Sequence, residues 1–134
     1  MTREQSLKKL YKAAAFVLKC EGESKLNVDI VFVGPKKMHE LNLKYRGKDK
    51  PTDVLSFRHL DVRDKFGDPK FLGEIILCSS YLRAQAKEYD VPYEEELVRM
   101  TIHGTLHLLN YDHIKPADAK KMLPLQEKYL AKFL

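Results

Sequence analysis

The 134-residue chain lacks the features that mark membrane and secreted proteins. No apolar run approaches the ~20 residues of a membrane-spanning helix, and no apolar signal segment follows the charges at the N-terminus. The only two cysteines, Cys20 and Cys78, lie far apart, which favours a reducing compartment over a disulfide framework. Because repeats, linkers and low-complexity tracts are also absent, we expect one cytoplasmic domain over residues 1–134.

The sequence does contain alternating helical and strand patterns. Five segments have features typical of helices: 3–19, 36–45, 79–89, 92–110 and 117–133. Three β-rich runs predict strands: 28–33, 53–57 and 73–78. The last run is continuously apolar, as in strands buried on both faces, while Pro124 predicts a kink or break in the final helix and Ser79 or Ser80 a helix cap. These patterns predict an α+β fold, with a small mixed β-sheet of three to four strands packed by about five helices.

Three of the five histidines lie close together near the C-terminus. His103 and His107 are four residues apart, so on a helix they project from one face. Asn110 accepts the left-handed conformation that ends helices, and a turn there would bring His113 towards the other two. A lone histidine is more often a core or surface residue, but three converging imidazoles favour a metal site. Zinc is the commonest occupant, and three protein ligands leave a position for water, as in catalytic sites.

The residue after the first histidine decides between types of zinc enzyme. Zinc peptidases use His-Glu-x-x-His, in which the glutamate is the general base. Here Gly104 occupies the glutamate position, although the spacing of the histidines equals that of the longer peptidase motif. Peptidase chemistry is therefore disfavoured. Other hydrolysis remains open, because zinc lowers the pKa of its bound water towards ~7 without a protein base.

Three strings resemble motifs of one known family. The string from His103 to His113, His-Gly-Thr-Leu-His-Leu-Leu-Asn-Tyr-Asp-His, resembles the signature of the YbeY family, bacterial metal-dependent endoribonucleases that mature ribosomal RNA. Residues 41–57 resemble its central block and residues 72–78 its Leu-Gly-Asp-Ile strand, so the likeness covers about residues 28–125 in order. Two positions depart from the family pattern: Asn110 stands for the usual Gly, and Arg58 for the usual Pro.

The resemblance implies specific roles for individual residues. His103, His107 and His113 would hold one Zn²⁺ on a zincin-like metal helix, which makes His103 catalytic as a ligand. Arg46 corresponds to an arginine treated as catalytic in the family, and its planar guanidinium fits two phosphate oxygens. Asp112 is expected either to orient a ligand imidazole or to bond nearby backbone.

The net charge of +5 is unevenly distributed. Residues 1–70 contain 16 lysines and arginines against 10 acidic residues, whereas residues 71–134 contain 8 against 9. The basic half fits a polyanion held there, although lysines on the first helix are expected only to solvate its surface. One compact basic cluster lies on a glycine-containing loop and is predicted to bind RNA: Lys44, Arg46, Lys48 and Lys50.

Four further residues of the central block have two alternative roles. Tyr45 and Phe57 could stack on bases of a single strand, but core packing is the commoner use of such residues. Asp53 and Ser56 either line the groove or bond locally, with Asp53 capping the preceding turn.

We therefore expect a metal-dependent endoribonuclease, specific for single strands and dependent on zinc, that acts in ribosomal RNA maturation and ribosome quality control. Its expected partners are single-stranded or ribosomal RNA and small ribosomal subunit proteins. Two alternatives remain: a non-enzymatic zinc-containing ribosome-assembly factor, and a zinc hydrolase of another substrate such as peptide. The absent fourth protein ligand argues against the first, and Gly104 argues against the second.

Overall fold

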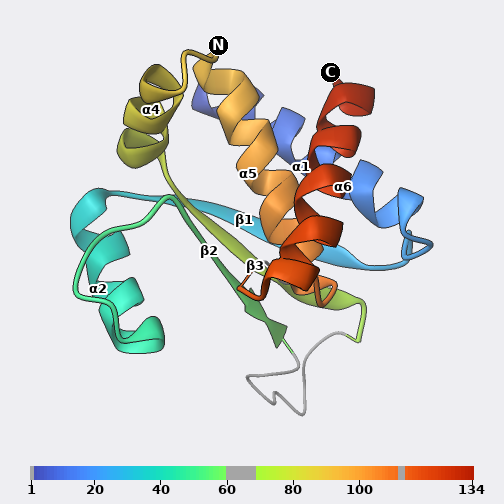
Figure 1. Ribbon diagram of the computed structural model, residues 1–134, viewed down its shortest axis with the longest axis horizontal. Helices are drawn as coiled ribbons and strands as arrows, with labels where there is room; N and C mark the ends of the chain where they lie inside the picture. Colours follow the sequence, from blue (N-terminus) through green and yellow to red (C-terminus); the bar gives the residue numbers. More distant parts are fainter. Residues whose placement is uncertain (1, 60–68, 112–113) are drawn as a thin grey trace.

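A three-stranded mixed sheet forms the centre of the structure, with helices packed against it (Figure 1). The computed structural model describes residues 2–59, 69–111 and 114–134. The elements of these ranges are α1 (Arg3–Cys20), β1 (Asn27–Val33), α2 (Pro35–Arg46), β2 (Val54–Arg58), β3 (Phe71–Cys78), α4 (Ser79–Glu88), α5 (Tyr93–Leu108) and α6 (Pro116–Phe133). The predicted α+β class is confirmed, since the described residues hold three strands and five α-helices. None of these helices is both long and apolar enough to span a membrane.

The central strand of the sheet is β3, which pairs in parallel with β1 and antiparallel with β2. Its side chains alternate between two hydrophobic clusters. Ile75 and Leu77 belong to a large core, whereas Ile76 and Cys78 belong to a smaller one. The prediction that this strand is buried on both faces is confirmed.

The large core holds α5 over the sheet. It contains buried residues of α1, α4, α5 and α6, and α5 contacts each of the other three helices (Figure 1). Leu97, Ile102 and Leu106 of α5 are fully buried in it. The smaller core lies on the other face, where Met38 and Leu41 of α2 pack against β2 and β3. The two cores therefore fix α5 on one side of β2 and α2 on the other.

Two details of the helices differ from the sequence prediction. The N-cap of α4 is Cys78, and no side chain caps this helix, because the extended backbone of β3 leads directly into Ser79 as its first residue. The α6 helix continues without a break through Pro124. Met122 and Tyr129, buried on either side of the proline, provide packing that offsets the backbone hydrogen bond that proline removes.

Gly73 lies where β3 passes closest to β2 and α5. A Cβ atom at this position would lie 2.2 Å from the carbonyl oxygen of Phe57 and 2.9 Å from Cδ2 of Leu108. The carbonyl belongs to a paired strand and cannot rotate away as a side chain could. We therefore expect Gly73→Ala to lower the free energy of unfolding by about 1–3 kcal/mol or more, measured by urea denaturation.

Gly34→Ala is the matched control for this substitution, because no atom lies within 4 Å of a Cβ built there. It should cost much less than Gly73→Ala. Equal urea midpoints for the two variants would show that the backbone approach at Gly73 is not tight.

Candidate functional site

Helix α5 presents His103 and His107 one turn apart, and both rings are held at Nδ1. Nδ1 of His103 lies 2.7 Å from Oε1 of Gln126 in α6, and Nδ1 of His107 lies 2.8 Å from Oγ of Ser56 in β2. Nε2 of Gln126 donates to Glu127 at 3.2 Å, which orients the amide. Because an amide oxygen only accepts hydrogen bonds, Nδ1 of His103 carries the proton, and the lone pair of this ring lies on Nε2. That is the tautomer in which an imidazole binds a metal through Nε2.

The other predicted metal-site residues, His113 and Asp112, lie outside the described residues. Within residues 2–59, 69–111 and 114–134, no group of three His, Cys, Asp or Glu side chains could hold a metal ion. His103 and His107 fit a metal ion in their spacing and in the way their rings are held. The three-histidine site stays a prediction.

Asn110 ends α5 in the left-handed backbone conformation that the sequence predicted, whereas the approach of His113 to the other histidines stays a prediction. Asn110 has a φ of 78°, the left-handed conformation. Its backbone N–H donates to the His107 carbonyl at 3.0 Å, and that of Tyr111 to the Leu106 carbonyl at 3.0 Å. Oδ1 of Asn110 also accepts a hydrogen bond from the guanidinium of Arg58 in β2. The two residues that depart from the family pattern thus contact each other.

Tyr111, the last described residue before the third histidine, is anchored by Glu21 at the end of α1. Its hydroxyl donates to one carboxylate oxygen at 2.6 Å, and the hydroxyl of Tyr129 in α6 donates to the other. The hydrogen bond to Glu21, with burial, raises the pKa of Tyr111 above its usual value. Burial, followed by the bond to the same carboxylate, raises the pKa of Tyr129. Both phenols therefore stay protonated at neutral pH and tie the turn to α1 and α6.

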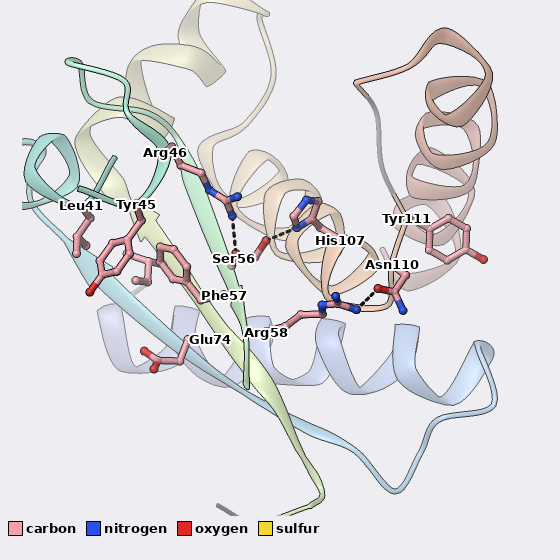
Figure 2. A pocket seen from close by; sticks show the side chains of 11 residues that line it. Leu41, Tyr45, Arg46, Ser56, Phe57, Arg58, Glu74, His107, Asn110 and Tyr111 are labelled. Atoms are coloured by element: carbon pink, nitrogen blue, oxygen red, sulfur yellow. Dashed lines mark hydrogen bonds between the residues drawn. The ribbon is translucent and has the colours of Figure 1, made fainter. Parts of the chain in front are cut away.

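A groove of about 820 Å³ crosses the edge strand β2 beside His107 (Figure 2). His107, Asn110 and Tyr111 line it on the side of α5. Residues of α2, β2 and β3 line the other side, among them Tyr45 and Phe57. The groove therefore joins the histidine helix to the end of the predicted RNA-binding segment.

Arg46, the last residue of α2, reaches this groove and is linked to a predicted metal ligand. Gly47, with a left-handed φ of 70°, ends the helix immediately after it. Nη2 of Arg46 donates to the carbonyl oxygen of Ser56 at 3.0 Å, and the hydroxyl of Ser56 contacts His107 (Figure 2). Ser56 therefore bridges the predicted phosphate-binding cation and the histidine helix. Of the two roles open to Ser56, lining the groove is the one observed.

The rest of the predicted basic cluster lies beside the groove. Lys44, Lys48 and Lys50 are exposed, but none of them lines it. Nζ of Lys44 lies 5.1 Å from the centre of the Tyr45 ring, which packs edge-on against Phe57 with ring centroids 5.1 Å apart. Tyr45 is 54% exposed, so the expected core packing is wrong for this residue. It lies in the last turn of α2, where its aromatic neighbour is the half-buried Phe57.

Two residues illustrate what sequence reasoning missed or left open. Gln126 was not predicted to contribute, because no motif in α6 indicates which of its side chains faces His103. The sequence leaves two roles open for Asp53, and its carboxylate accepts the N–H of the adjacent Val54 at 2.8 Å and an N–H of the distant Gln85 at 3.2 Å. It does not line the groove.

The surroundings of Gly104 leave no space for the glutamate that zinc peptidases have at this position. Gly104 is buried, and a Cβ built on it would lie 3.0 Å from Cγ2 of Ile75 in β3. The helix therefore rests on the sheet at the position where zinc peptidases place their glutamate. A carboxylate side chain has no room there and would be buried without water, which argues against peptide hydrolysis.

Comparisons with known proteins identify the family of this chain. The family model described as Endoribonuclease YbeY matches residues 1–134. An Endoribonuclease YbeY of Thermodesulfovibrio yellowstonii is 42% identical over 132 residues, covering 97% of this chain and 76% of the relative. Another, from Lactobacillus helveticus, is 41% identical over 117 residues, which are 81% of this chain and 67% of the relative.

A solved structure supports the same relationship. The solution structure of a Thermotoga maritima protein matches with a TM-score of 0.68 and 31% identity, covering 99% of this chain and 84% of that one. The whole-chain family match and relatives at about 40% identity lead to one conclusion. This chain belongs to the YbeY family of endoribonucleases.

Proposed function

We propose that this protein is a zinc-dependent endoribonuclease that cuts single-stranded RNA in the cytoplasm, in ribosomal RNA maturation and ribosome quality control. The observation that carries the proposal is the bridge through Ser56, which joins Arg46 and His107 in one groove. The names of the relatives support RNA as the substrate. The role in ribosome maturation follows from the family resemblance, and it makes ribosomal RNA and small ribosomal subunit proteins the expected partners.

The metal would be held by three histidines of this chain, His103, His107 and His113. Zn²⁺, when bound, supplies Lewis acidity and lowers the pKa of a coordinated water towards ~7. Gln126 and Ser56 contact the rings of His103 and His107 at Nδ1, which would leave Nε2 of each ring for the metal. A carbonyl or hydroxyl partner at Nδ1 is the usual support for such ligands, and this support favours the zinc assignment.

Arg46 would bind the phosphate at which the RNA is cut. A guanidinium has five N–H donors, and the bond to the Ser56 carbonyl fixes its position while other donors remain for phosphate oxygens. The charge that develops on those oxygens during cleavage is then stabilised by a cation already in place. Single-stranded RNA is the favoured substrate, because only unpaired strands expose bases to the aromatic residues of the groove.

Metal removal tests the proposed reaction. Zinc-loaded protein should cut a single-stranded RNA, and treatment with a chelator should abolish cleavage, which added zinc should restore. The same RNA annealed to its complement is the control and should resist cleavage. If the zinc-loaded protein binds the single strand without ever cutting it, the ribosome-assembly factor is the better description. Undiminished cleavage by protein shown to be metal-free would refute metal dependence.

A further inference from the structure

One end of the groove combines two aromatic rings with a carboxylate. Tyr45, Phe57 and Glu74 gather on the side of β2 that faces α2, away from His107 (Figure 2). Phe57 and Glu74 are direct partners in the antiparallel ladder between β2 and β3, so their side chains stand on the same face of the sheet. Tyr45 packs edge-on against Phe57 from α2.

We propose that this end of the groove is a subsite for one unpaired nucleobase of RNA, which stacks on the exposed Tyr45 ring next to Phe57 and donates a hydrogen bond from its exocyclic amino group to Glu74. The proposal rests on the proposed function, whose substrate it specifies. Adenine, cytosine and guanine carry such an amino group, whereas uracil has none and presents its one N–H between two carbonyl oxygens. The subsite is therefore expected to disfavour uracil.

Tyr45 and Phe57 have the features of a site on which a nucleobase stacks. Tyr45 is 54% exposed although it is a large aromatic residue, and ring surface left in water is stabilised when a base covers it. Two cations lie over the rings: the Arg46 guanidinium is 5.6 Å from the Phe57 ring centre, and Nζ of Lys44 is 5.1 Å from that of Tyr45. Aromatic surfaces interleaved with cations are how single-stranded nucleic acids are bound, because bases stack on the rings while phosphates contact the cations.

Glu74 determines which part of a nucleotide fits at this end. Its exposed carboxylate only accepts hydrogen bonds, and its charge repels a phosphate. A base edge that carries an amino group supplies the donor that a carboxylate requires, as in the pairing of acidic side chains with cytosine. The phosphates of the same strand are left to the basic side of the groove, at Arg46.

The topology of β2 connects this subsite to the proposed cutting site. Successive side chains of a strand point to opposite faces, so Ser56 faces α5 and His107, while Phe57 faces α2. Arg46 contacts both residues, through the Ser56 carbonyl and over the Phe57 ring. An RNA strand that crosses the edge of β2 would place a base on Phe57 and Tyr45 and an adjacent phosphate at Arg46.

Stacking can be measured independently of cleavage with a fluorescent base. The probe is a short oligouridine with 2′-O-methyl riboses, checked to remain intact, that carries a single 2-aminopurine. Zinc-loaded wild type should quench the fluorescence of 2-aminopurine on binding. Tyr45→Ala should lose the quenching and bind about 10-fold more weakly, and Tyr45→Phe should keep both. The matched control is Tyr89→Ala, which removes another exposed tyrosine (62%) that does not line the groove.

An abasic probe and a charge variant complete the test. When the 2-aminopurine is replaced by an abasic site, wild type and Tyr45→Ala should bind equally. Wild type should prefer an oligouridine with one adenine over plain oligouridine by about 10-fold, and Glu74→Ala, which removes the acceptor, should abolish that preference. Wild-type quenching and affinity in Tyr45→Ala would overturn the subsite, as would an unchanged preference in Glu74→Ala.

The subsite and the nuclease can fail separately. Quenching that depends on Tyr45 in a protein that never cuts RNA would support the subsite and refute the proposed reaction. Cleavage of RNA without quenching would refute the subsite and leave the reaction standing. A wild-type protein that neither binds the probe nor cuts RNA would refute both.

Discussion

His107→Ala is expected to lose bound zinc and cleavage of single-stranded RNA together. The substitution removes a proposed ligand on α5 whose ring is held by Ser56. Loss of a residue that merely supports a ligand lowers metal affinity or activity by about 10- to 100-fold, so loss of the ligand itself should cost more than about 100-fold. Zinc content after gel filtration and the rate of cleavage of a labelled single strand are the two measurements.

Two further variants separate the ligand role from general damage. His39→Ala removes a histidine that pairs with Asp49 at 2.6 Å and does not line the groove, so zinc content and activity should stay at wild-type values. Ser56→Ala keeps the imidazole of His107 but removes its support, and an intermediate loss of about 10- to 100-fold is expected. A zinc-free His107→Ala protein that cleaves RNA at the wild-type rate would refute the assignment.

Arg46→Ala, in contrast to His107→Ala, should keep bound zinc and lose cleavage. The side chain is exposed at the end of α2, so the fold and the zinc content should be retained. Cleavage should fall by about 100-fold or more, because a donor positioned for developing charge is removed. Arg46→Lys should restore only part of the rate, since a lysine cannot form the two parallel hydrogen bonds of a guanidinium. Rates under single-turnover conditions measure both effects.

The salt dependence of RNA binding provides an independent check on Arg46. Each phosphate contact contributes to the slope of binding constant against salt concentration, so Arg46→Ala should reduce that slope by about one. Lys12→Ala is the control, because this exposed lysine of α1 is expected only to solvate the surface and does not line the groove. Its effect on cleavage should be small. An Arg46→Ala protein with the wild-type rate of cleavage would contradict the phosphate-binding role.

Most of the fold could be predicted from the sequence, because the signals concerned are local. The expected strand at 73–78 is the central strand, extended by two residues to Phe71, and its uninterrupted apolar side chains are buried on both faces. Asn110 adopts the left-handed backbone that its residue type allows. Both features depend on neighbours in the sequence, so the residues themselves reveal them.

The parts that could not be predicted depend on contacts between distant segments. Gln126 follows His103 by 23 residues, and its role is decided by how α6 packs on α5. Tyr45 is an aromatic residue of a type that usually packs in a core. It is exposed because it lies in the last turn of α2, and the position of that turn relative to β2 is a tertiary feature. The helix also continues through Pro124 because Met122 and Tyr129 are buried, and helix propensities do not include such tertiary packing.

The hydrogen bond between Arg58 and Asn110 has an evolutionary consequence. Both residues replace the amino acids that the family pattern has at these positions, and the bond connects the end of β2 to the reversal after α5. A lineage that exchanged only one of them would have lacked this connection. The two positions are therefore expected to depend on each other, because changing either residue alone removes the hydrogen bond.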